Sequence, residues 1–298
     1  MPASVTADPA EARAPEPADR GRLRWWKEVL FGAAVYAIYS AVRNQFGSAG
    51  GDPGPAFEHA RQIIRLEEAI GLYVEPSIQS WYLDLPADGL IRAWNVFYGI
   101  AHFLVTFVAL VWLFRSDPRR YPLWRNTLAL TTCVAVIGFA AYSLMPPRLL
   151  DDPGEFGACQ IYAPDAASAA DPGDLSSPDC DRYGYVDTIA RYGGWISFGN
   201  EGMKDVSNQY AAMPSMHIGW STWSALVLVP LLRRRWAKVL AALYPVVTLV
   251  CIVVTGNHYW VDGIGGLLCL GAGFLIAKAI TGRRRASVVP PAVADVRG

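Results

Sequence analysis

Two short polar islands interrupt the apolar segment between residues 211 and 266. The first, at residues 213–217, reads MPSMH, and the second, at residues 256–263, reads GNHYWVDG. The sequence between them is apolar except for one basic cluster, and it is long enough for two helices of the roughly 20 residues that cross a bilayer. It therefore predicts a membrane hairpin that brings two histidines and one aspartate to the same end of the fold.

The composition of the whole chain is typical of a membrane protein. Of its 298 residues, 53% are hydrophobic and only 17% are charged, whereas a soluble domain usually carries about a quarter charged residues. The formal net charge is zero, so we expect no nucleic-acid partner. We expect an all-α fold, a polytopic membrane protein built as a bundle of six transmembrane helices. The apolar runs that would form them cover residues 25–43, 90–114, 122–145, 214–232, 236–256 and 259–280.

Lysine and arginine are concentrated beside alternate ends of these runs. Most of the 26 basic residues fall within residues 13–27, 115–125, 233–238 and 278–297. Because basic residues flank transmembrane helices mainly on the cytoplasmic side, we expect a multi-pass protein of the cell membrane with both termini in the cytoplasm. The active site formed by the two islands would then face the extracytoplasmic side.

Composition also divides the chain into a membrane domain and two tails. Residues 1–24 are polar and rich in proline and alanine, which is typical of a disordered cytoplasmic tail, and residues 282–298 form a basic cytoplasmic tail. The catalytic membrane domain is expected over residues 25–281, with residues 146–213 as a long extracytoplasmic loop. Between residues 55 and 71, apolar and charged residues alternate at helical spacing, which predicts an interfacial amphipathic helix.

Two of the five cysteines, Cys159 and Cys180, share the long polar loop. A disulfide between them could form if the loop faces an oxidising compartment, but their spacing alone leaves the question open. The other three cysteines lie in apolar runs, where we expect them to pack as small apolar side chains.

The second island combines a histidine with a carboxylate. His258 and Asp262 are four residues apart and would share one face of a helix. A carboxylate in that position can accept the Nδ1–H of the ring and leave Nε2 free to act as a nucleophile or base. His258 also lies where the sixth run begins, and the unpaired N–H groups of a helix N-terminus favour a phosphate. Gly256 just before it permits a tight turn.

The first island also reads as the start of a helix. Pro214 suits the first helical position, which would place Ser215 and His217 in the first turn beside exposed N–H groups. Two prolines end the third run and hold Arg148 near the membrane surface, where its guanidinium could bind phosphate oxygens. Lys204 could add a further donor.

The histidines could also have structural or metal-binding roles. His59 is expected on the surface of the amphipathic helix, and His102 as a hydrogen-bonding group inside the second run. His217, His258 and Asp262 could also form a facial triad for iron or zinc. The spacing of His258 and Asp262 fits orientation of the ring better, and no further ligand is evident in the sequence, so we expect no metal and no cofactor.

These motifs resemble those of a known family. The element PSMH at residues 214–217 resembles the second signature of the phosphatidic acid phosphatase type 2 superfamily, and HYWVD at residues 258–262 resembles its third. With the PPR element at residues 146–148, they look closer to the branch that contains inositol phosphorylceramide synthases. The resemblance covers roughly residues 57 to 280.

The resemblance implies a role for each motif residue. His258 would attack phosphorus, Asp262 would orient it, and His217 would protonate the leaving group. Apart from the resemblance, we expect the phosphate-binding residues to be Arg148, Ser215, Lys204 and Asn257.

Two cations of the superfamily are absent from their usual places. Ala141 stands where the first signature has a lysine, and Ile252 stands where the third has an arginine. These departures favour the transferase-like branch over plain hydrolysis of phosphatidic acid.

We therefore expect an integral membrane lipid phosphatase or phosphotransferase, similar to an inositolphosphotransferase. It would act on a lipid-linked phosphate ester through a phosphohistidine intermediate. The acceptor would be water or an alcohol such as inositol, and neither the lipid nor the acceptor follows from the sequence. The alternative is a non-catalytic lipid-phosphate binding or transport protein that uses the same pocket.

Overall fold

The computed structural model describes residues 24–46, 52–86, 88–169, 180–193 and 209–286. Over these ranges the protein is helical, and its β-structure is limited to an isolated parallel bridge between Leu144 and Ala211. The expectation of an all-α fold is thus confirmed for the part of the chain that is described. Residues 1–23 of the expected N-terminal tail and residues 287–298 of the expected C-terminal tail lie outside the described residues, whereas residues 282–286 are helical rather than part of a tail.

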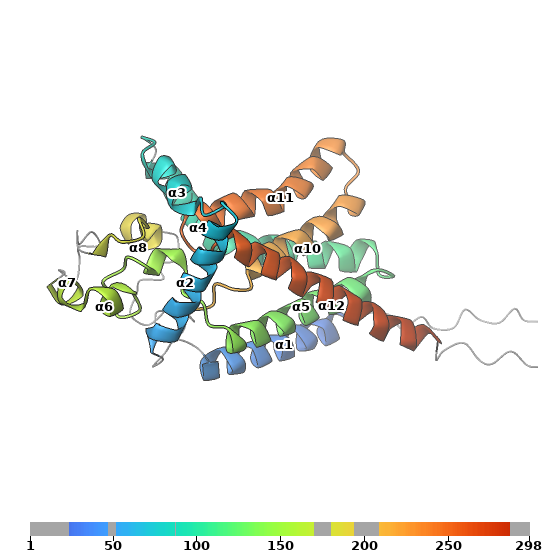
Figure 1. The fold of residues 1–298 in the computed structure, drawn as a ribbon. Helices are drawn as coiled ribbons and strands as arrows, with labels where there is room; N and C mark the ends of the chain where they lie inside the picture. Colours follow the sequence, from blue (N-terminus) through green and yellow to red (C-terminus); the bar gives the residue numbers. More distant parts are fainter. Residues whose placement is uncertain (1–23, 47–51, 87, 170–179, 194–208, 287–298) are drawn as a thin grey trace, which may run out of the picture.

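Six long helices form the bundle (Figure 1). They are α1 (Trp25–Phe46), α4 (Asp88–Ser116), α5 (Tyr121–Ala141), α10 (Met216–Leu231), α11 (Arg235–Val254) and α12 (Trp260–Ala286). Four of them, α4, α5, α11 and α12, are long and apolar enough to cross a membrane. Among the described helices, α1 and α10 do not meet that criterion, and α10 has only 16 residues. Four of the six expected membrane spans are therefore supported by the length and composition of their helices.

The other helices, most of them short, gather at one end of this bundle, on the left in Figure 1. They are α2 (Pro53–Ala69), α3 (Glu75–Leu83), α6 (Cys159–Tyr162), α7 (Pro164–Ala169), α8 (Thr188–Tyr192) and the 3-10 turn η1 (Pro147–Leu149). A disulfide joins Cys159 to Cys180 and closes part of this region. The turn between α10 and α11 and the C-terminal part of α12 lie at the opposite end.

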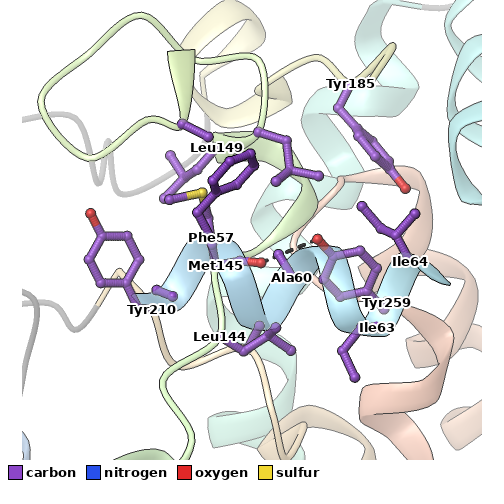
Figure 2. Close-up of a cluster of buried hydrophobic side chains, with 14 residues drawn as sticks. Phe57, Ala60, Ile63, Ile64, Leu144, Met145, Leu149, Tyr185, Tyr210 and Tyr259 are labelled. Atoms are coloured by element: carbon purple, nitrogen blue, oxygen red, sulfur yellow. Dashed lines mark hydrogen bonds between the residues drawn. The ribbon is translucent and has the colours of Figure 1, made fainter. Parts of the chain in front are cut away.

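The expected amphipathic helix is present as α2, and one of its faces packs into a buried apolar cluster. Figure 2 shows Phe57, Ala60 and Ile64 of α2 beside Met145 and Tyr259, and the Tyr259 hydroxyl donates to the Met145 carbonyl at 3.3 Å. This cluster joins α2 to the segment after α5 and to the start of α12, so it supports the region where both polar islands lie.

Burial along α2 does not simply follow whether a residue is apolar or charged. Leu66 and Ile70 are 49% and 52% exposed, whereas Glu67 is fully buried. A second short helix, α3, follows a turn at Gly71, where φ is +70°, a conformation that glycine adopts without strain.

Glycines allow α12 to approach its neighbours closely. A Cβ on Gly266 would lie against the Ser215 carbonyl, and one on Gly265 would come within 3.1 Å of Pro214. Further along, a Cβ on Gly273 would lie 2.6 Å from the Thr131 hydroxyl oxygen on α5. Side chains at these positions would force the helices apart.

Candidate active site

The turn that carries His258 is the C-terminal end of α11. Thr255 follows the last helical residue, and Gly256 adopts φ +66°, the left-handed conformation that commonly ends a helix. The N–H groups of Gly256 and Asn257 return to the carbonyls of Val253 and Ile252 at 2.9 and 3.0 Å. Gly256 therefore ends α11 in a tight turn, as expected, and directs the chain toward His258.

His258 precedes the first residue of α12 rather than lying inside the helix. Its ring is only 3% exposed. Its Nδ1 lies 2.8 Å from the Ala212 carbonyl and 3.2 Å from Asp262 Oδ2. Since a carbonyl and a carboxylate can only accept, Nδ1 carries the proton, and Nε2 keeps its lone pair.

Asp262 accepts hydrogen bonds from two groups at the start of α12. The same Oδ2 atom accepts the Tyr259 N–H at 3.0 Å, which is the arrangement of a capping residue that reaches back from the first helical turn. The prediction that His258 and Asp262 share a helical face was therefore wrong in detail, because His258 lies two residues before Trp260, where α12 begins. The carboxylate reaches the ring across the N-terminus of the helix instead.

The first island lies directly against this turn. Ser215 is the N-cap of α10, a position that favours serine. The prediction that Pro214 occupies the first helical position was wrong, because α10 begins at Met216. The backbone N–H of Ser215 donates to the Asp262 carbonyl at 2.9 Å, so the two islands are hydrogen-bonded to each other.

The imidazoles of the two islands are in direct contact. His217 Nδ1 lies 3.3 Å from His258 Nε2, and the ring centroids are 5.4 Å apart. Because Nε2 of His258 has the lone pair, Nδ1 of His217 must donate the hydrogen in this contact. On its other sides His217 stacks on Tyr98, with centroids 4.2 Å apart, and contacts His102 at 4.1 Å.

His102 takes the hydrogen-bonding role that the sequence suggested, with one addition, whereas His59 differs from its expected position. His102 is 8% exposed, and its Nδ1 lies 3.0 Å from the Tyr98 carbonyl, but its ring also packs against His217. His59 is half-buried rather than on the surface. Its Nδ1 lies 2.7 Å from the Ser143 carbonyl, and its ring stacks on Tyr142.

Arg148 joins the site through its backbone and its guanidinium. Its N–H donates to the Gly256 carbonyl at 2.7 Å. Nη1 binds Asp187 and Nη2 binds Gln209, both at 2.7 Å. Burial disfavours the charged guanidinium, but the carboxylate of Asp187 outweighs it, so the pKa of Arg148 lies above its ordinary value. The charge of Arg148 is also close enough to Tyr98 for the two to interact.

The remaining expected phosphate ligands differ in their placement. The side-chain amide of Asn257 donates to the carbonyl and hydroxyl oxygens of Thr255 at 3.3 and 2.9 Å, so it stabilises the turn. Lys204 lies outside the described residues. Ser215 is fully buried, and its hydroxyl has no hydrogen-bond partner in the described part of the chain.

Several polar atoms in this region lack a partner among the described residues. They are Arg148 Nε, Ser215 Oγ, His217 Nε2 and Asp262 Oδ1, all of them buried. Buried polar atoms without partners are uncommon in native proteins, and Arg148 Nε and Ser215 Oγ can both donate to phosphate oxygens. The described residues contain no group of three or more His, Cys, Asp or Glu side chains arranged to hold a metal ion.

Sequence reasoning did not identify Tyr98 and Asp187 as members of this site. Tyr98 lies in an apolar run, where an aromatic residue gives no functional signal. Asp187 lies in a loop with several other aspartates. Its Oδ1 accepts the Ile189 and Ala190 N–H groups as the N-cap of α8, while Oδ2 binds Arg148.

The comparison with known proteins agrees with the motifs. No curated protein and no solved structure matches the chain significantly. A family model described as the PAP2 superfamily matches residues 61–276, a range that includes Arg148 and both polar islands. Since this match covers most of the chain, the protein belongs to the PAP2 superfamily.

Proposed function

We propose that this protein is an integral membrane lipid phosphatase or phosphotransferase that uses His258 as its nucleophile. Membership of the PAP2 superfamily suggests phosphatase-type chemistry on a lipid phosphate. The observation that carries the proposal is the hydrogen bonding of His258. Nδ1 is held by two acceptors while Nε2, with its lone pair, faces a second histidine 3.3 Å away.

In the first step, Nε2 of His258 forms a bond to the phosphorus of the lipid phosphate ester, and the bond from phosphorus to the leaving oxygen breaks. For this step His217 carries a proton on both ring nitrogens; it gives its Nδ1 proton to that oxygen and becomes a neutral imidazole. The positive charge that develops on His258 is stabilised by Asp262, which accepts the Nδ1–H. The product of this step is a phosphohistidine and a free alcohol.

In the second step, the acceptor hydroxyl gives its proton to His217 and attacks the phosphohistidine. The bond between phosphorus and Nε2 breaks, and both histidines return to their starting protonation states. Water as the acceptor gives a phosphatase, and an alcohol such as inositol gives a phosphotransferase. Arg148 and Ser215 are proposed to bind the phosphoryl oxygens, with Lys204 and Asn257 as further ligands.

The contact between the two rings sets one requirement on this mechanism. Phosphorus must bind to the same Nε2 atom that now accepts the hydrogen bond from His217. The rings must therefore separate when the lipid phosphate binds, and the N–H of His217 is then free to reach the leaving oxygen.

The membrane arrangement is proposed on the same basis. All six long helices would span the bilayer, with residues 25–281 as the membrane domain and residues 146–213 outside the cytoplasm. The basic turn between α10 and α11 lies at the end of the bundle opposite the short helices, which supports an extracytoplasmic site and cytoplasmic termini. The disulfide between Cys159 and Cys180 fits an oxidising compartment.

The finer assignment, to an inositolphosphotransferase-like branch, rests on the PPR, MPSMH and GNHYWVD elements and on the two absent cations. It predicts that alcohol acceptors compete with water for the phosphohistidine.

The test is turnover by the purified full chain in detergent micelles, with lipid phosphates as donors and with or without inositol. We expect release or transfer of phosphate by the wild type and none above background by His258→Ala. His59→Asn is the matched control, because His59 lies outside the site and asparagine can keep the hydrogen bond to Ser143. Full activity in His258→Ala would reject the proposal. Lipid phosphate that binds both proteins, with no turnover by the wild type for any lipid, would favour the non-catalytic alternative.

A further inference from the structure

Two fully buried glutamates lie beside the active-site turn without taking part in the proposed chemistry. Glu67 is near the end of α2, and Glu75 is the first residue of α3; both are 0% exposed. Charged side chains are almost never fully buried unless they are paired. Their partners therefore indicate what they do.

Glu75 binds the first residue of α12. Its Oε1 accepts the Trp260 N–H at 3.1 Å, and its Oε2 accepts the Val74 N–H at 3.0 Å. The indole N–H of Trp260 donates to the Leu72 carbonyl at 2.9 Å. The corner between α2 and α3 thus holds Trp260 by both its backbone and its side chain, two residues after His258.

Glu67 lies close enough to Glu75 for the two carboxyls to interact, and no side-chain donor is paired with it in the described part of the chain. Neither of its carboxyl oxygens has a hydrogen-bond partner in the described structure. The ionisable groups that interact with it there are all acids: the carboxyls of Glu75 and Asp262 and the phenols of Tyr73 and Tyr259. An ionised Glu67 would place two negative charges side by side in a buried site, whereas a protonated one can donate to Glu75.

The electrostatic environment favours the protonated form. Burial, and then the charge of Glu75, raises the pKa of Glu67 to about 9, and the N–H of Val261 opposes this shift without cancelling it. In an unfolded chain the same carboxyl would titrate near 4.5. The folded protein therefore holds a proton at neutral pH that the unfolded chain releases.

We propose that Glu67 and Glu75 share one proton and that this carboxyl pair fixes the first turn of α12, which makes Glu75 a positioning residue for His258 and Asp262. The positioning role rests on the proposed function of His258; the shared proton does not. Glu67 donates its proton to Glu75, and Glu75 accepts from Glu67, Val74 and Trp260 together. Asp262 lies in the same turn of α12, so the orientation of the His258 ring depends on this anchor.

The shared proton has a consequence for stability that does not involve catalysis. Between about pH 4.5 and pH 9 the folded state binds more protons at this site than the unfolded state. The stabilisation from protonated Glu67 is therefore complete below pH 4.5 and is lost as the pH rises toward 9. In Glu67→Gln the amide replaces the protonated carboxyl as a donor. Because the amide does not titrate, the variant should not lose this stabilisation as the pH rises.

The experiment compares the full chain in micelles with Glu67→Gln, Glu75→Gln and the control Glu68→Gln, since Glu68 is the exposed neighbour of Glu67. Thermal midpoints are measured without substrate from pH 6 to about pH 10, a range that includes the upper part of the pH interval in which the stabilisation from protonated Glu67 is lost. As the pH rises, we expect the thermal midpoint of Glu67→Gln to fall less than that of the wild type. The thermal midpoint of Glu68→Gln should change with pH as that of the wild type does. Parallel curves for Glu67→Gln and the wild type would overturn the shared proton.

Turnover then tests the positioning role. Glu67→Gln keeps the donor, so its kcat should stay within about twofold of the wild type at pH 7. Glu75→Gln loses the negative charge and should lower kcat about tenfold or more, with little change in KM. A kcat for Glu75→Gln equal to that of the wild type would overturn the positioning role. If Glu75→Gln does not fold, Glu75→Asp replaces it in the experiment. This variant should likewise lower kcat with little change in KM.

The two proposals fail in different ways. A wild type without turnover would reject the proposed function, and the thermal midpoints would still decide the shared proton. Activity that survives His258→Ala would reject the nucleophile and leave the midpoint result unaffected.

Discussion

Replacing Asp262 with asparagine should slow the enzyme by a limited and calculable amount. The Nδ1–H of His258 has two acceptors, the Ala212 carbonyl at 2.8 Å and Asp262 Oδ2 at 3.2 Å. In Asp262→Asn the amide oxygen can take the place of Oδ2 and keep the bonds to His258 and to the Tyr259 N–H. The amide nitrogen then occupies the place of Oδ1, which has no partner among the described residues.

The substitution therefore removes a charge but leaves the tautomer in place. The Ala212 carbonyl alone keeps the proton on Nδ1, so Nε2 keeps its lone pair. What is lost is the charge-assisted part of one hydrogen bond. A bond to a charged group contributes about 1.5–3 kcal/mol and a neutral one about 0.5–1.5 kcal/mol, so the loss is about 1–1.5 kcal/mol. Since about 1.4 kcal/mol corresponds to a factor of ten, kcat should fall roughly 5- to 12-fold.

Initial rates of phosphate release or transfer in micelles, with thermal midpoints as a check on folding, measure this effect. A rate equal to that of the wild type would show that Asp262 does not stabilise the charge on His258. A loss of about 10⁴-fold or more, as occurs when an asparagine substitution leaves a catalytic histidine in the wrong tautomer, would show that the Ala212 carbonyl does not hold the proton.

Other substitutions test the surroundings of the site. Arg148→Lys replaces a two-pronged donor by a point charge and should raise KM about tenfold with a smaller change in kcat; an unchanged KM would exclude Arg148 from phosphate binding. Cys159→Ser opens a disulfide with a sequence separation of 21, so it should cost about 3 kcal/mol, and reducing agent should lower the thermal midpoint of the wild type equally. Gly266→Ala places a methyl group against the Ser215 carbonyl and should destabilise the protein by about 1–3 kcal/mol. In the control Gly271→Ala the new methyl group meets no atom within 4 Å, so stability should not fall. Equal thermal midpoints for the two glycine variants would contradict the close packing of α10 and α12.

The long elements followed from local sequence patterns. Apolar runs predicted the helices of the bundle, because a bilayer-spanning segment must satisfy its backbone hydrogen bonds internally. The helical spacing after residue 55 predicted α2. Gly256 predicted the turn before His258, since its conformation suits few other residues.

Details at the helix ends did not follow from the same patterns. His258 and Asp262 were expected on one helical face, but α12 begins between them, and Asp262 reaches back to the ring as a capping residue does. Pro214 was expected to open α10, but Ser215 is its N-cap. Spacing in the sequence sets which residues can meet, whereas the boundary of a helix depends on capping contacts that tertiary structure selects.

The partners of the motif residues were the least accessible to sequence reasoning. Asp187 binds Arg148, and Tyr98 stacks on His217, through contacts between distant segments. Glu67 looked like an ordinary charged position of an amphipathic helix, yet the fold buries it beside Glu75. No local pattern distinguishes such residues, because their environment is created by elements far away in the sequence.

The most direct test of the central claim is to trap the phosphorylated enzyme. The full chain is mixed briefly with a lipid labelled in its phosphate, quenched in alkali, which preserves phosphohistidine, and digested for mass spectrometry. The account predicts label on His258, its absence in His258→Ala, and its accumulation in a variant of His217 that can no longer activate the acceptor. Label on another residue, or turnover by the wild type with no phosphate ever bound to the protein, would contradict it.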